Sequence, residues 1–375
     1  MSIADYKLFT PLKLGEGFEL KNRIVHAPLT RGRANRDRTP SELIQLYYEQ
    51  RVGAGLIVAE GTAISEQGYG WYRVPGLYNQ EQLAAWKKVV DRVHKKDGKI
   101  VLQLWHAGRQ SHSSFNAKKE VVAPSAIRVV DGSTRDVDAI KSSFEMPRAL
   151  DIDEIPTIVE HFRRSAALAL DAGFDGVEIH GGNGYLVDTF LQSSTNKRTD
   201  KYGGSFENRA RFLLEVVEAV KMVYPSDRIG VRLSPNGAYG SMGAEDNYEM
   251  FNYAMDQLSK HGLAYLSLID AYGFTGFHEK CRPTTAFDAK KMFKGVVMAN
   301  NDYMRDSAEG ALRSGAADLV AFGRPYISNP DLAERFLNDC PLNPPASYET
   351  YFSQRTLDKD PGDGYVDFPA YEPKP

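Results

Sequence analysis

The hydrophobic and polar residues of this chain follow two alternating patterns. Short, almost wholly apolar runs recur along the sequence, and most are followed by a longer stretch whose apolar residues repeat with the period of an amphipathic helix. This alternation is typical of parallel βα units, whose strands are buried on both faces. It predicts eight strands, at Arg23–Leu29, Leu56–Thr62, Ile100–His106, Gly176–His180, Arg228–Ser234, Ala264–Ile269, Val296–Ala299 and Asp318–Phe322.

Amphipathic helical stretches separate the predicted strands. The first, Ser41–Arg51, begins at a start signal, Thr39-Pro40-Ser41. Eight βα units in one chain predict an α/β fold of the (β/α)8 TIM-barrel type, whose chemistry lies at the C-terminal ends of the strands. A doubly wound sheet would need a glycine-rich nucleotide turn after its first strand, where this chain reads APLTRGR. The other predicted helices are Glu81–Lys96, Ile155–Ala172, Phe206–Val223, Tyr248–His261, Ala308–Ser314 and Leu332–Asn338.

Two predicted loops are too long to be simple connections. Arg109–Leu150 follows the third strand and Gly181–Ser205 follows the fourth. Long loops in compact domains are usually lids or binding loops, so we expect both at the active site. The tail from about 358 to 375 is rich in Pro, Gly and Asp and is predicted to be irregular. The whole chain, 1–375, is expected to form one domain.

Composition narrows the class of protein. The 375 residues are 42% hydrophobic and 25% charged with a formal net charge of -3, which gives no reason to expect nucleic acid as a partner. The two cysteines, Cys281 and Cys340, form no CxxC motif, so neither a disulfide framework nor a metal or iron–sulfur site is indicated. No apolar signal core or membrane-length run occurs. These features predict a cytoplasmic protein without a membrane partner, and they are compatible with a monomer or a homodimer.

Chemistry-bearing residues cluster where the fourth predicted strand ends. His180, Asn183 and Tyr185 lie within one glycine-spaced turn. An imidazole and a carboxamide can polarise a carbonyl or nitro oxygen, and a phenol can then protonate the carbon beside it. The alternative is that His180 and Asn183 only hold a turn together and that Tyr185 packs on the following helix.

The other strand ends present a largely uncharged set with selected basic groups. The first two strands end in mostly small residues, at 27–30 and 59–62, which would let a flat ligand lie close. Gln103 can hydrogen-bond the edge of a pyrimidine-like ring, and Arg232 can stabilise negative charge on it, unless it forms a buried salt bridge in the barrel. Backbone N–H groups after strands seven and eight, with Arg324, predict a phosphate site.

These residues stand in motifs that resemble the Old Yellow Enzyme family of FMN-dependent ene-reductases. The resemblance runs from about Leu8 to the segment Gly364–Pro369, and it is closest to the plant and bacterial oxophytodienoate, cyclohexenone and nitrate-ester reductases. The motifs are NRIVHAPLTR, LQLWHAGR, HGGNGYL, NKRTDKYGGSFENRARF and FGRPYISNPDL.

The resemblance implies a role for each matching residue. His180 and Asn183 would bind the activating oxygen of the substrate, and Tyr185 would be the proton donor. Trp105 would form a pocket wall, and the loop after strand six could add Tyr272, Phe274 and Phe277 to it. The residues implied in FMN binding are Pro28, Leu29, Thr30, Gly61, Gln103, Arg232, Asn301, Asp302, Tyr303, Gly323 and Arg324.

The chain departs from the family pattern in three places. Many relatives have glycines where this chain has Asn301 and Asp302, and we expect Asp302 to turn away from the phosphate because like charges repel. Two glycines, Gly181 and Gly182, stand where an alanine often precedes the asparagine, which would loosen the turn. Near the C-terminus, relatives often carry a tyrosine at the second position of Tyr351-Phe352.

The activity that the resemblance implies is an NADPH dehydrogenase of the ene-reductase type. NADPH or NADH would reduce FMN, and hydride would pass from flavin N5 to the β-carbon of an α,β-unsaturated carbonyl or nitro compound. Tyr185 would protonate the α-carbon. The alternatives are a non-catalytic flavin-binding or structural barrel, and a dienoyl-CoA reductase-like enzyme, which would need a cysteine cluster and further domains that this sequence lacks.

Overall fold

The computed structural model describes residues 2–270, 276–353 and 360–372. Its centre is a closed barrel of parallel strands that pair in chain order, with the last strand returning to the first. All eight predicted strands are present. They are β3 (Ile24–His26), β4 (Leu56–Val58), β6 (Ile100–Trp105), β11 (Gly176–Gly181), β12 (Ile229–Leu233), β13 (Tyr265–Ile269), β14 (Val297–Asn300) and β15 (Leu319–Phe322).

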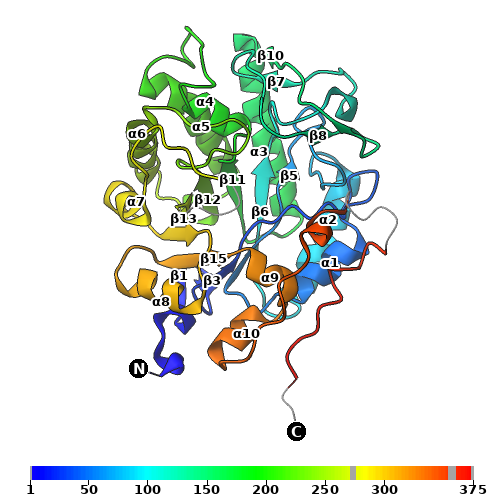
Figure 1. Ribbon diagram of the computed structural model, residues 1–375, viewed down its shortest axis with the longest axis vertical. Helices are drawn as coiled ribbons and strands as arrows, with labels where there is room; N and C mark the ends of the chain where they lie inside the picture. Colours follow the sequence, from blue (N-terminus) through cyan, green and yellow to red (C-terminus); the bar gives the residue numbers. More distant parts are fainter. Residues whose placement is uncertain (1, 271–275, 354–359, 373–375) are drawn as a thin grey trace.

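Helices surround the barrel (Figure 1). Some of them begin at side-chain caps that the sequence carries: Ser41 accepts from the N–H of Ile44, and Ser205 from that of Asn208. The helices that follow successive barrel strands are α1 (Glu42–Glu49), α2 (Gln80–His94), α3 (Ile155–Asp171), α5 (Phe206–Lys221), α6 (Asn247–Ser259), α7 (Ala286–Met292), α8 (Arg305–Arg313) and α10 (Leu332–Leu337). The TIM-barrel prediction is confirmed.

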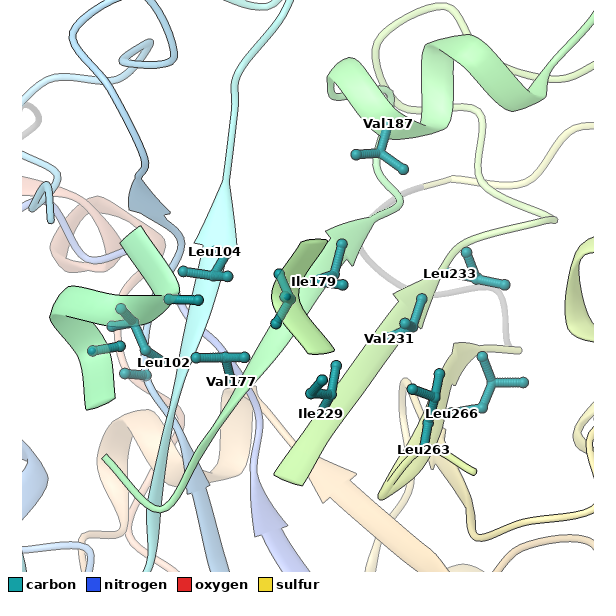
Figure 2. Close-up of a cluster of buried hydrophobic side chains, with 14 of the residues drawn as sticks. Leu102, Leu104, Val177, Ile179, Val187, Ile229, Val231, Leu233, Leu263 and Leu266 are labelled. Carbon is teal, nitrogen blue, oxygen red and sulfur yellow. The ribbon is translucent and has the colours of Figure 1, made fainter. Parts of the chain in front are cut away.

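Two layers of apolar side chains hold the barrel. The outer layer lies between the strands and the helices, and Figure 2 shows part of it, where β6, β11, β12 and β13 contribute alternate residues. The inner layer fills the barrel itself with side chains such as Val25, Val101 and Met298. Because both faces of each strand are covered, every residue of β6, β11 and β12 is buried, as the continuous apolar runs predicted.

Several elements were not predicted from the pattern. The second predicted strand divides into β4 and β5 (Thr62–Ala63), which both pair with β6. An N-terminal hairpin of β1 (Leu12–Gly15) and β2 (Phe18–Leu20) precedes the barrel. The predicted loop after strand four contains α4 (Leu186–Leu191), and α9 (Arg324–Ser328) follows β15.

The long connection between β6 and α3 contains short strands. β7 (Val122–Ala123) pairs with β10 (Arg148–Ala149), and β8 (Thr134–Arg135) with β9 (Lys141–Ser142). Figure 1 shows β7, β8 and β10 grouped at one end of the molecule, away from the N-terminus. In the tail, residues 360–372 form turns without a helix or strand.

Candidate active site

A cavity of about 540 Å³ lies at the C-terminal ends of the barrel strands. Its walls come from segments that follow each strand, so residues far apart in the sequence meet there. Of the predicted site residues, Tyr272 and Phe274 lie outside the described residues, and Phe277 does not line the cavity. The lining includes all the others: Pro28, Leu29, Thr30, Gly61, Gln103, Trp105, His180, Asn183, Tyr185, Arg232, Asn301, Asp302, Tyr303, Gly323 and Arg324.

His180 is a buried, neutral imidazole on β11. It is 5% exposed and pairs in register with Arg232 of β12. Burial lowers its pKa well below the usual 6.5, and the positive charge of Arg232 lowers it further. Its Nδ1 accepts from the backbone N–H of Gly182 over 3.4 Å, so the ring proton lies on Nε2. His180 therefore has both of the roles that the sequence left open. Its Nδ1 holds the turn together, and its Nε2–H is a hydrogen-bond donor.

The backbone of Asn183 is held on two sides. Its φ is 58°, its N–H donates to Ser234 Oγ over 2.6 Å, and its carbonyl accepts from Gln110 Nε2 over 2.5 Å. A Cβ on Gly182 would come within 2.8 Å of Ser234 Oγ, so the glycine lets Ser234 approach the turn. The Asn183 side-chain oxygen is buried without a protein partner, although it lines the cavity. This carboxamide is therefore left to bind a ligand.

Tyr185 is a protonated phenol packed between two rings. Its ring centroid lies 5.2 Å from that of Trp105 and 5.1 Å from that of His180, in edge-to-face geometry. Burial raises the phenol's pKa well above 10, and the nearby Tyr239 raises it further. The hydroxyl therefore keeps its proton at neutral pH and can donate it.

A polar network lies beneath these residues, inside the barrel. Gln103 Nε2 donates to the buried Glu178 over 2.7 Å, and Arg232 Nη2 donates to Asn300 Oδ1 over 2.6 Å. Burial raises the pKa of Glu178, and Arg232 opposes this. The guanidinium of Arg232 thus hydrogen-bonds a carboxamide rather than a carboxylate, and its Nη1 is buried without a protein partner. Sequence reasoning missed Glu178, whose only signal is an acid within a buried strand.

The loop after β14 takes an unusual course. Asn301 and Asp302 have φ values of 110° and 56°, in the region that glycine prefers. Tyr303 donates to Asp270 over 2.9 Å. The Asp302 carboxylate contacts the guanidinium of Arg324, so it lies beside the predicted phosphate ligand rather than turned away from it.

Five aromatic residues in the described lining had not been assigned to the site. They are Trp71, Tyr239, Phe322, Tyr351 and Phe352. Trp71 and Phe352 meet with ring centroids 5.7 Å apart, although 281 positions separate them in the sequence. Phe352 therefore lines the cavity from the position where relatives often carry tyrosine. No local pattern distinguishes these aromatics from core residues.

A clamp behind the cavity holds the segment that carries Tyr351 and Phe352. The buried Arg31 donates to the carbonyl oxygens of Tyr351, Thr350 and Gly364, over 2.8, 3.2 and 2.8 Å. Arg33 adds bonds to Tyr351 and Thr350. Sequence reasoning assigned no role to either arginine, because their partners near the C-terminus are backbone groups more than 300 residues away.

The cavity fits a flat ligand with polar edges and an anionic end. Gly61 brings no side chain to the wall, and a Cβ added there would meet Gln103 Oε1 at 3.4 Å, in van der Waals contact. Unpartnered polar atoms of Trp105, Asn183 and Arg232 surround the cavity. Such an arrangement suits the isoalloxazine ring of a flavin, and Arg324 is a lining cation that an anionic group could meet.

The described residues contain no group of three or more His, Cys, Asp or Glu side chains suited to hold a metal ion. Among the same residues, no helix has both the length and the apolar character to cross a membrane.

Known proteins share both the sequence and the fold. The profile of the NADH:flavin oxidoreductase / NADH oxidase family matches residues 7–343. Putative 12-oxophytodienoate reductase 11 of Oryza sativa subsp. japonica is 41% identical over 96% of this chain and 97% of its own length. 12-Oxophytodienoate reductase 2 of Arabidopsis thaliana is 38% identical over 97% and 96%.

Solved structures agree with these sequence relatives. An Old Yellow Enzyme homologue from Zymomonas mobilis superposes with a TM-score of 0.90 at 40% identity, over 97% of this chain and 99% of its own. Morphinone reductase in complex with tetrahydroNAD superposes with a TM-score of 0.89 at 40% identity, over 97% and 98%. The chain therefore belongs to the NADH:flavin oxidoreductase / NADH oxidase family, the Old Yellow Enzyme family that its motifs resemble, and its cofactor is FMN.

Proposed function

We propose that this protein is an NAD(P)H-dependent ene-reductase that saturates the C=C bond of α,β-unsaturated carbonyl or nitro compounds. The observation that carries the proposal is one wall of the cavity, where a neutral imidazole donor, an unpartnered carboxamide and a protonated phenol stand together. The names of the relatives support an alkene substrate, since they are reductases of 12-oxophytodienoate and of morphinone.

The residues at the strand ends would hold the cofactor. Bound FMN supplies the redox chemistry, because its ring accepts a hydride from NAD(P)H and gives one up to carbon. Gln103 presents its oxygen and one N–H beside Gly61, since its other N–H is taken by Glu178. Arg232 keeps Nη1 for the ring edge, and Arg324 is the cation for the phosphate. The remaining proposed contacts are Pro28, Leu29, Thr30, Asn301, Tyr303 and Gly323, with Asp302 contributing its backbone rather than its carboxylate.

His180 and Asn183 would bind the oxygen of the substrate's carbonyl or nitro group. Their N–H groups draw electron density toward that oxygen and so make the β-carbon electrophilic. Tyr185 then gives its proton to the α-carbon. Hydride and proton together saturate the double bond, and a proton from solvent restores the phenol. Trp105, edge-on to Tyr185, would limit how the alkene lies.

The test is an anaerobic visible spectrum of the purified protein, first with NADPH and then with 2-cyclohexenone. The proposal expects a yellow protein that bleaches with NADPH and recovers its colour when the enone is added. A protein that bleaches but keeps the reduced spectrum in the presence of cyclic enones, enals and nitroalkenes would contradict the ene-reductase proposal while leaving the flavin in place. Repeating the reduction with NADH measures the preference between the two reductants.

A further inference from the structure

The cation proposed for the FMN phosphate already has an anionic partner in the protein. Asp302, in the loop after β14, contacts the guanidinium of Arg324, at the start of α9. Both side chains are about half exposed, at 45% and 49%, so they lie at the rim of the cavity rather than within the barrel. Both also line the cavity.

No other cation in the described lining is positioned to replace Arg324. The charged side chains that line the cavity are Arg31, Arg232, Asp302 and Arg324. Arg31 is turned toward the carbonyl oxygens of the C-terminal segment, and Arg232 lies in the barrel with Asn300. At the end formed by β14 and β15, the charges of Asp302 and Arg324 therefore cancel.

The loop conformation keeps the carboxylate beside the arginine. Asp302 has a φ of 56° and follows Asn301, whose φ is 110°. Tyr303, the next residue, is tied to Asp270 on the other side. The Tyr303 bond anchors the loop directly after Asp302, and the contact with Arg324 places the Asp302 carboxylate where an anion would meet that guanidinium.

We propose that Asp302 is an internal competitor of the FMN phosphate for Arg324. The inference rests on the proposed role of Arg324 in FMN binding. A phosphate monoester carries a charge of about -1.5 to -2 at neutral pH, so it must share the guanidinium with a carboxylate that repels it. This competition weakens FMN binding and lowers its dependence on salt, because the protein offers no net positive charge at that end.

The expected effect is moderate because water screens both side chains. A unit charge at such separations near a protein surface changes a binding constant by about 5- to 20-fold. The substitution Asp302→Asn removes the charge and keeps the size, and asparagine tolerates the left-handed backbone at this position. The variant should therefore bind FMN about 5- to 20-fold more tightly than the wild type.

The experiment is a titration of FMN, followed by its fluorescence, with the full chain freed of flavin. It compares the wild type with Asp302→Asn in 0.05 M and 0.5 M NaCl. The advantage of the variant should shrink to about twofold at the higher salt concentration, where screening is stronger. Riboflavin lacks the phosphate, so its Kd should change less than about twofold in the variant at either concentration.

A matched control is Asp306→Asn. Asp306 is an exposed acid four residues further on that pairs with Arg305, and it does not line the cavity. Its removal should change the Kd of FMN by less than about twofold, although it alters the net charge of the protein equally.

Three results would overturn the inference. They are an Asp302→Asn variant that binds FMN no more tightly than the wild type, an equal gain for riboflavin, and an equal gain in Asp306→Asn. In each case FMN still binds the wild type, and the proposed ene-reductase function stands. A wild type that binds no FMN would instead remove the basis of both proposals.

Discussion

Tyr185 is the residue on which the proposed proton transfer depends. Because its pKa lies well above 10, the phenol is protonated throughout the pH range in which the protein would work. Tyr185→Phe should lower the rate of alkene reduction by about 10²–10⁴-fold, the usual size of a general-acid contribution. Flavin reduction by NADPH needs no such proton and should change less than about threefold. Stopped-flow measurement of the two half-reactions separates these effects, and equal alkene reduction in the variant would exclude the role.

A substitution at Gly61 tests whether FMN lies against the part of the cavity wall beside Gln103. An alanine there would meet Gln103 and Trp105 at 3.4 to 3.6 Å, which the fold tolerates. Gly61→Ala should therefore change the free energy of unfolding of the flavin-free protein by no more than ~1 kcal/mol. Its methyl group would occupy the ligand's space, so the Kd for FMN should rise by about tenfold or more. Urea unfolding and FMN titration measure the two quantities, and an unchanged Kd would place the flavin elsewhere.

At the scale of the elements, the β1–β2 hairpin contributes to the stability of the fold rather than to the chemistry of the cavity. Phe18 and Leu20 are fully buried and pack with Leu56 and Leu319, the first residues of β4 and β15. The hairpin therefore closes the barrel at the end opposite the cavity. The guanidinium of Arg228 lies 4.7 Å from the Phe18 ring centroid and covers it from outside.

Phe18→Ala should lower the free energy of unfolding by ~3–5 kcal/mol, because it leaves a cavity in the packed interior. The rates of flavin reduction and alkene reduction at 25 °C should stay within about twofold, since the change is at the other end of the barrel. Urea unfolding followed by circular dichroism measures the first effect. A large loss of activity in the folded variant would show that the two ends are coupled.

At the scale of the whole molecule, buried titratable groups make stability depend on pH. Burial lowers the pKa values of His26 and His106 to about 3, and it raises that of Glu60 to about 7. In the unfolded chain these histidines bind protons near pH 6.5, but in the folded state they stay neutral until about pH 3. The two histidines therefore lower the free energy of unfolding as the pH falls from about 6.5 toward 3. Glu60 acts in the opposite sense. Its buried carboxylate destabilises the folded state above about pH 7, and protonation below that pH relieves the destabilisation.

His106→Asn isolates one of these contributions. The Asn side-chain oxygen can replace His106 Nδ1 as acceptor for the N–H of Gly108. The wild type should lose up to ~1.4 kcal/mol of unfolding free energy per pH unit relative to the variant, between about pH 6.5 and 4. Urea unfolding at several pH values gives the difference. Parallel curves for the two proteins would show that His106 takes up its proton in the folded state.

The sequence by itself determined the barrel and the location of its chemistry. Buried parallel strands must be apolar on both faces, so their positions can be predicted from local runs such as Gly176–His180. Because parallel strands end at the same side of a barrel, His180, Gln103 and Arg232 had to converge. The predicted secondary structure differs from the observed one where backbone pairing overrides the local pattern. The run Leu56–Thr62 divides into β4 and β5, and α4 forms inside a predicted loop.

Only the tertiary structure decided which side chains face one another. Asp302 was expected to turn from the phosphate position, and it lies against Arg324 instead. Arg31 binds carbonyl groups over 300 residues away, and Glu178 orients Gln103 from the neighbouring strand. The physical reason is that local pattern governs burial and strand position, whereas the direction of each side chain and its long-range partner depend on packing that no local stretch of sequence contains.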